Sequence, residues 1–192
     1  MEVEFVFVAT EAIHAERLKM GYEDMNTYPF VLRAYENEQS KEKAEQIAKT
    51  FDVVIFGASP VEYCELRMKE DKLAFRFCER SLKKGTYRRF IPRTRKKINR
   101  EYIQFKDKNF FILCASAFTA LDLALCGFPK EKCFRWGYFP KVEEYDVNSL
   151  LTQKGSEQVN LLYAGRLIKL KRVIDTLKAL NILVKKGYTN LL

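Results

Sequence analysis

The chain has 192 residues, 47% of them hydrophobic, and a formal net charge of +9 at pH 7. This length fits one domain or slightly more, and this hydrophobic content excludes a disordered chain. No apolar run approaches the ~20 residues that span a bilayer, and no signal peptide follows Met1. The positive charge indicates anionic partners, namely nucleotide phosphates, an acidic membrane surface or nucleic acid.

Five cysteines and one histidine bear on compartment and metal binding. The number of cysteines is odd, no Cys-x-x-Cys motif occurs, and most of their neighbours are apolar. We therefore expect reduced thiols in the core of a cytoplasmic protein. No structural zinc site is expected, because cysteine and histidine ligands are not clustered.

Short apolar runs recur along the first 140 residues with helix patterns between them. Runs of continuous rather than alternating hydrophobicity are typical of buried parallel strands. The expected strands are residues 2–10, 28–35, 51–56, 73–78, 109–115 and 133–139. Helices are expected over residues 40–50, from Ser59 onward, and from Ser116 to residue 126, with Gly127 as a left-handed stop. The pattern predicts a parallel α/β sheet that is covered on both faces.

Two serines are placed to begin helices. Ser59 precedes Pro60, and Glu62 follows three residues after the serine, which predicts an N-cap with proline at the first helical position. Ser116 follows the strand at residues 109–115 and is expected to cap the next helix, although it could also line a cleft.

Residues 83–100 contain nine basic residues and no acidic ones. Ile98, Tyr102, Ile103 and Phe105 suggest a helix with one apolar side. The stretch reads either as a solvated helix face or as a segment that binds an anionic bilayer. Nucleic acid is a weaker alternative, because the interleaved residues look like core or membrane anchors rather than stacking platforms.

A second unit is expected after residues 141–158, which read as a linker. Residues 159–164 form an apolar run that breaks at Gly165, and a helix pattern follows from Val173 until Gly187 ends it. This order predicts a strand, a tight turn and a helix, the βα unit of a parallel sheet.

The turn carries four cations, Arg166, Lys169, Lys171 and Arg172, before the first acidic residue, Asp175. The N-terminus of a helix favours negative charge, so these cations repel one another unless an anion lies among them. Arg166 can contact a phosphate with two N–H groups, and Lys171 can reach it as a point charge. The alternative is a solvated basic turn.

The order strand, Gly165-Arg166-Leu167, Lys171 and helix resembles the diphosphate-binding turn of family-four glycosyltransferases, which are GT-B enzymes. Other segments resemble a bacterial branch of this family that makes surface polysaccharides and glycolipids. These segments are residues 7–11, 16–24, 75–80, 114–120 and 135–140.

The resemblance implies an acceptor-side Rossmann-like domain at residues 1–140, a linker at 141–158 and the start of a donor-binding domain at 159–192. It implies that Gly165, Arg166 and Lys171 hold the diphosphate of a nucleotide-sugar donor of the hexosyl type. It also implies transfer with retention of configuration, without a metal, to a glycan or lipid-linked acceptor. The expected localisation is cytoplasmic, with attachment to the inner face of the plasma membrane if residues 83–100 bind the bilayer.

Glu79 and Arg80 follow the strand at residues 73–78 and should lie at the carboxyl edge of the sheet, where ligands of open α/β folds bind. Glu79 is the candidate carboxylate near the sugar or general base for the acceptor hydroxyl. An ion pair between Glu79 and Arg80 is the structural alternative.

The sequence departs from the family pattern at both ends. No glycine-containing loop precedes Glu2, so an opening strand is expected to be missing. The chain stops at Leu192, before the paired glutamates of the family, so we expect either a fragment of a larger gene product or a degenerate remnant, inactive or nearly so as it stands. The competing interpretation is a non-enzymatic basic module that binds an anionic membrane or nucleic acid. A P-loop enzyme is not indicated, because the Gly-x-x-x-x-Gly-Lys-[Ser/Thr] motif is absent.

Overall fold

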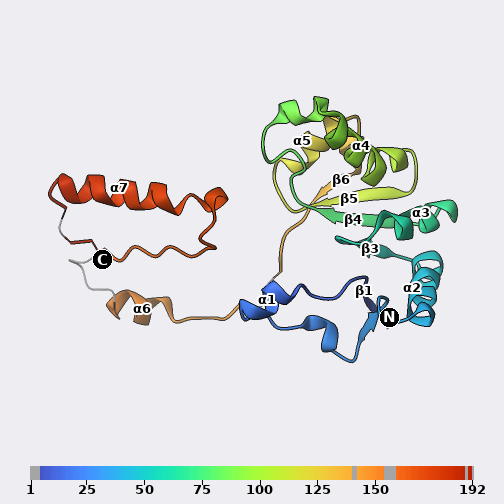
Figure 1. Cartoon of the computed structure of the whole chain (residues 1–192), viewed down its shortest axis with the longest axis horizontal. Helices are drawn as coiled ribbons and strands as arrows, with labels where there is room; N and C mark the ends of the chain where they lie inside the picture. Colours follow the sequence, from blue (N-terminus) through green and yellow to red (C-terminus); the bar gives the residue numbers. More distant parts are fainter. Residues whose placement is uncertain (1–4, 140–141, 154–158, 189, 192) are drawn as a thin grey trace. The chain divides into compact units, whose positions relative to one another are not determined.

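A computed structural model describes residues 5–139, 142–153, 159–188 and 190–191 of the chain. The chain divides into two compact units, Met1–Phe139 and Pro140–Leu192. Figure 1 shows the elements of each unit in sequence colours. The two units are described separately below.

The first unit contains a four-stranded parallel sheet. Its strands lie in sequence order and are β3 (Val54–Phe56), β4 (Ala74–Cys78), β5 (Phe110–Cys114) and β6 (Cys133–Arg135). All four fall within runs that the sequence predicts as strands. The expectation of a mixed α/β fold with a parallel sheet is therefore confirmed, and a fold of the GT-B type remains a prediction.

Helices follow the strands, as the alternating pattern predicts. They are α2 (Glu38–Thr50), α3 (Val61–Lys69), α4 (Pro92–Glu101) and α5 (Thr119–Ala124), with short 3-10 turns η2 (Thr86–Phe90), η3 (Ile103–Phe105) and η4 (Lys130–Lys132). Gly127 follows α5 with φ +99°, so the predicted left-handed stop is confirmed.

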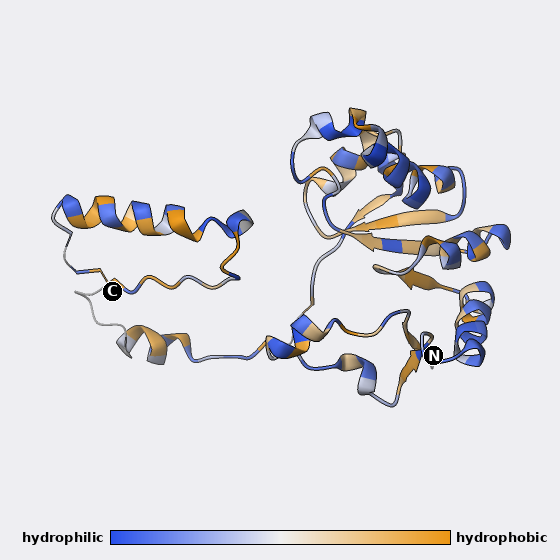
Figure 2. Cartoon of the chain, in the orientation of Figure 1, coloured by the Kyte–Doolittle hydropathy of each residue, from blue (hydrophilic) through white to orange (hydrophobic). Residues whose placement is uncertain are grey.

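The core lies where the two central strands meet the helices. Ala74, Phe110 and Ile112 are fully buried, and Phe110 contacts the rings of Phe105 and Phe128 at centroid distances of 5.2 and 6.2 Å. Figure 2 shows the strands as predominantly hydrophobic and α2 as predominantly hydrophilic. Continuous apolar strands packed by amphipathic helices thus account for this part of the fold.

Arg67 ties two segments of the first unit together from a fully buried position on α3. Its guanidinium donates to the carbonyl oxygens of Ala48, Phe51, Asp52 and Leu73 at 2.7–2.9 Å. These acceptors lie at the end of α2, just before β3 and just before β4. The side chain therefore satisfies carbonyl groups that the end of a helix leaves without partners.

A separate two-stranded parallel sheet precedes the four-stranded one. It consists of β1 (Phe7–Ala9) and β2 (Val31–Arg33), with α1 (Ala15–Lys19) and the 3-10 turn η1 (Met25–Thr27) between them. The predicted strand exists, but the prediction that it is buried is wrong for the described residues. Phe7 is 58% exposed, because its strand pairs with β2 alone in this part of the chain, and its ring forms a T-shaped pair with Phe30.

The second unit contains α6 (Val147–Gln153), the 3-10 turn η5 (Lys169–Lys171) and α7 (Val173–Lys185). The helix after the Gly165 turn is confirmed, and Gly187 follows it with φ +89°. The segment 141–158, which the sequence analysis reads as a linker, contains the helix α6.

The strand expected at residues 159–164 does not form among the described residues. Val159 makes one parallel bridge to Leu191, with its N–H donating to the oxygen of Asn190 at 2.8 Å, and residues 160–164 are irregular. A strand needs a ladder of backbone hydrogen bonds with a neighbour, and one bridge does not supply it.

Candidate functional site

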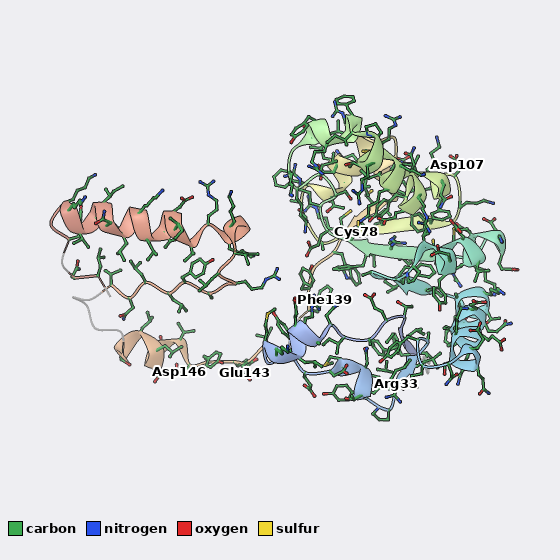
Figure 3. The ribbon with its side chains drawn as sticks, viewed as in Figure 1. Arg33, Cys78, Asp107, Phe139, Glu143 and Asp146 are labelled. Atoms are coloured by element: carbon green, nitrogen blue, oxygen red, sulfur yellow. The ribbon has the colours of Figure 1, made fainter. Side chains whose placement is uncertain are left out.

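A cavity of about 640 Å³ opens in the first unit at the carboxyl ends of β3 and β4. Its walls come from the loop after Phe56, the end of β4 at Cys78 and the last turn of α4. Figure 3 labels Cys78 at this end of the strand. The carboxyl edge of a parallel sheet is the place where open α/β folds bind ligands.

Arg76 projects from the middle of β4 and is only 5% exposed. Its Nη2 donates to the carbonyl oxygen of Ser59 at 3.3 Å, and its guanidinium carbon lies 5.7 Å from the centre of the Tyr102 ring. Nη1 is buried and has no hydrogen-bond partner among the described residues, which also provide no carboxylate within 4.0 Å for an ion pair. A buried cation without a matching anion is costly, so its presence needs an explanation.

The N-terminus of α3 borders the same cavity and lacks a side-chain cap. The prediction that Ser59 caps this helix is wrong: Pro60 is the N-cap residue and the helix starts at Val61. Pro60 has extended backbone angles, which places Ser59 one residue too early to reach the first-turn N–H groups. Ser59 Oγ is instead buried without a partner in the described part of the chain.

Most of the carboxylates that line the cavity are held by cations. Glu62 pairs with Arg100. Glu101 lies 3.7 Å from the ammonium of Lys97. Glu11, an exposed residue before α1, is the remaining acidic group beside Glu79.

Glu79 lines the cavity as the sequence predicts, and its neighbours differ from those expected. Its carboxylate pairs with Lys83 and accepts a hydrogen bond from the hydroxyl of Tyr138. That hydrogen bond raises the pKa of Tyr138, because a charged acceptor stabilises the protonated phenol. The arrangement fixes the carboxylate at the edge of the sheet.

Arg80 does not pair with Glu79. Its Nε donates to Asp122 Oδ2 on α5 at 3.0 Å, and its guanidinium lies 4.8 Å from the centre of the Phe118 ring. The predicted Glu79–Arg80 ion pair is therefore wrong, because a fully buried carboxylate on α5 takes the arginine. Arg80 is not among the described residues that line the cavity.

Ser116 has a local structural role. Its hydroxyl accepts from the N–H of Phe118 at 3.3 Å, and Phe118 is the N-cap residue of α5. The serine thus stabilises the turn before the helix rather than the helix start itself. It does not line the cavity described above.

The residues expected to bind a diphosphate lie in the second unit, before α7. Arg166 and Lys171 are exposed, and neither forms an ion pair with the described carboxylates. The neighbouring Arg172 differs, since it takes a left-handed conformation at φ +54° and pairs with Asp175. A Cβ on Gly165 would lie 3.3 Å from the hydroxyl of Tyr163, so glycine permits this close approach.

Two residues of the first unit escape recognition as functional or structural candidates from sequence alone. Arg76 interrupts the continuous apolar strand Ala-Phe-Arg-Phe-Cys, and Asp122 interrupts the apolar helix Thr-Ala-Leu-Asp-Leu-Ala. A charged residue inside a buried element is the signal that could have identified both.

Within the described ranges, no three His, Cys, Asp or Glu side chains gather as a metal site would require. The helices in these ranges are all too short or too polar to cross a bilayer.

Comparisons with protein-family models, with curated proteins and with solved structures each found no match to this chain.

Proposed function

We propose that the chain is part of a GT-B glycosyltransferase that transfers a sugar from a nucleotide-sugar donor to a glycan or lipid-linked acceptor. The proposal rests on the resemblance of the Gly165 turn to the diphosphate-binding turn of family-four enzymes. The parallel α/β architecture of the first unit is compatible with it.

The main structural support for the proposal is that two cations before α7 are exposed and available to an anion. Arg166 and Lys171 are exposed and without a carboxylate partner in the described part of the chain, whereas Arg172 beside them is paired. The N-terminus of the 13-residue helix α7 adds partial positive charge. These groups suit a pyrophosphate, whose negative charge must be stabilised as the sugar–oxygen bond breaks.

Glu79 is the proposed acceptor-side group. It lies at the carboxyl edge of the sheet and is held by Lys83 and Tyr138. A fixed carboxylate there could accept the proton of an acceptor hydroxyl or stay close to the transferred sugar. In the complete enzyme, Glu79→Gln removes the base and keeps the shape, so it should lower transfer while nucleotide-sugar binding is unchanged.

Calorimetric titration of the full chain with nucleoside diphosphates and their sugar conjugates tests the donor assignment. Arg166→Ala and Lys171→Ala should each weaken binding about tenfold or more, because each removes charge-assisted hydrogen bonds to phosphate. Lys178→Ala and Lys185→Ala, on the helix α7 that follows the turn, are the controls and should change affinity little. Equal effects of all four variants would show nonspecific attraction and remove the donor site.

Residues 83–100 support a second candidate function, attachment to an anionic membrane surface. Tyr87 is 62% exposed and Phe90 is 68% exposed, and both lie in η2 between the basic residues. On α4, Arg93, Arg95 and Lys96 are exposed while Ile98 is buried in the core. Exposed aromatic and basic side chains together are typical of surfaces that bind the bilayer interface.

Flotation with vesicles tests this second candidate. Vesicles with anionic lipid should carry the chain, and neutral vesicles should not, with binding that falls as salt rises. At any given salt concentration, replacing both Tyr87 and Phe90 by Ser should reduce flotation below that of the unsubstituted chain. Binding to DNA of equal strength at the same salt would favour a general polyanion surface instead.

A further inference from the structure

The two buried arginines of the first unit differ in how their charge is satisfied. Arg67 donates to four carbonyl oxygens at 2.7–2.9 Å. Arg76 makes one bond, of 3.3 Å, and its Nη1 has no partner among the described residues. Arg67 therefore has a complete structural role, whereas Arg76 lines the wall of a cavity and carries a charge that no described carboxylate matches within 4.0 Å.

We propose that this cavity binds an oxyanion, a phosphate or carboxylate group of a small ligand, between Arg76 and the N-terminus of α3. Nη2 of Arg76 contacts Ser59, which immediately precedes the start of that helix, so the guanidinium and the first-turn N–H groups lie on one side of the cavity. A helix N-terminus favours an anion, and a guanidinium can donate two parallel bonds to it.

The buried hydroxyl of Ser59 supplies a second independent group. Its Oγ does not cap α3 and has no other hydrogen-bond partner in the described part of the chain. Buried polar groups are nearly always hydrogen-bonded in proteins. A bound oxyanion would balance the unmatched charge of Arg76 at the cavity wall and would meet the uncapped end of α3.

The acidic residues of the cavity limit what else the ligand carries. Glu62 and Glu101 are paired with Arg100 and Lys97, and Glu79 is paired with Lys83, so their negative charge is partly neutralised, while Glu11 is the remaining acidic residue of the lining. Carboxylates with phenolic groups such as Tyr138 are suited to ligand hydroxyls. A volume of about 640 Å³ lies within the range of small-molecule sites. The ligand class is therefore a phosphorylated or acidic sugar.

The site belongs to the first unit and does not rest on the donor site proposed above. The test is a residue-resolved NMR titration of the full chain with inorganic phosphate, glucose 1-phosphate, glucuronate and glucose. Both anionic sugars or one of them should shift the amide resonances of Val61 and Glu62, and glucose should not. Stronger binding of glucose 1-phosphate identifies a phosphate site, and stronger binding of glucuronate a carboxylate site.

Variants separate this proposal from a structural role of Arg76. Ser59→Ala should weaken anion binding several-fold, Glu101→Gln should strengthen it, and Lys43→Met, an exposed control on α2, should leave it unchanged. Arg166→Ala should also leave it unchanged, so failure of the donor site and failure of this site can be told apart.

Stability gives an independent readout. Since the charge of Arg76 is not matched in the described structure, Arg76→Met should leave the denaturation midpoint unchanged or raise it, while anion binding is lost. A strongly lowered midpoint would show that Arg76 is structural and would overturn the proposal. Absence of shifts at Val61 and Glu62 with every anion, at millimolar concentration and low salt, would overturn it as well.

Discussion

The guanidinium of Arg80, just after β4, lies 3.0 Å from the buried carboxylate of Asp122 on α5, 42 residues further along the chain. The same carboxylate oxygen accepts the backbone N–H of Leu82 at 2.9 Å. Asp122 thus holds the segment after β4 against α5. Because Arg80 pairs with Asp122, Glu79 pairs with Lys83 instead.

Replacing Asp122 by alanine should destabilise the fold by about 2–3 kcal/mol, because the buried N–H of Leu82 and the partly exposed Arg80 both lose their acceptor. Asp107→Ala, at an exposed position labelled in Figure 3, is the matched control and should cost less than about 0.5 kcal/mol. Denaturant unfolding monitored by circular dichroism measures both. Equal midpoints for the two variants would show that the contact contributes nothing.

Arg67→Met should be among the most destabilising substitutions in the first unit, with a loss of more than about 3 kcal/mol. It leaves the carbonyls of Ala48, Phe51, Asp52 and Leu73 without their donor. Arg93→Met makes the same substitution on the exposed face of α4 and is the control, which should change stability little. A small effect at Arg67 would mean that water replaces the guanidinium at these carbonyls.

The buried thiols make stability depend on pH in the alkaline range. Burial raises the pKa of Cys64 and of Cys78 from 9.0 to about 12. The folded state therefore favours the protonated thiols, and their contribution to stability is complete below pH 9 and lost as pH rises toward 12.

The free energy of unfolding should fall across this window, and Cys64→Ala should reduce the slope. Because only the thiolate reacts, both thiols should also resist alkylation at pH 8 until the protein unfolds. Unfolding curves at several pH values, with timed iodoacetamide labelling, provide the measurement. Rapid labelling of Cys64 in the folded protein at pH 8 would contradict this prediction.

Gly127 terminates α5 in a conformation that side chains disfavour, at φ +99°. Gly127→Ala should cost about 1–2 kcal/mol from backbone strain alone, since no atom lies within 4 Å of the added Cβ. Gly137→Ala also meets open space, and its φ lies outside the positive range, so it should be nearly neutral. Thermal unfolding of the two variants should separate strain from steric contact.

Elements with a strong local pattern were predictable from sequence. β4, β5 and α7 lie inside predicted segments, because a continuous apolar run specifies a central strand and a repeat of 3.6 residues specifies a helix. All five cysteines are free, as the odd count and their apolar neighbours indicate.

Features that depend on distant partners were not predictable. The exposure of Phe7 and the irregular path of residues 160–164 follow from which strands lie beside them, which no local pattern states. The predicted N-cap at Ser59 is wrong by one residue, which is the usual uncertainty of helix ends. The pairing of Arg80 with Asp122 and the incomplete hydrogen bonding of Arg76 appear only when segments far apart in sequence are brought together.

The most direct test of the proposed function asks where a nucleotide sugar binds. The full chain, labelled with ¹⁵N, is titrated with nucleotide sugars of different bases, and resonances are followed at Gly165, Arg166, Lys171 and the first turn of α7. We predict saturable shifts at these residues for at least one donor, lost in the Arg166→Ala/Lys171→Ala double variant. Shifts that are absent there, or that persist in the double variant, would contradict the assignment of a glycosyltransferase donor site.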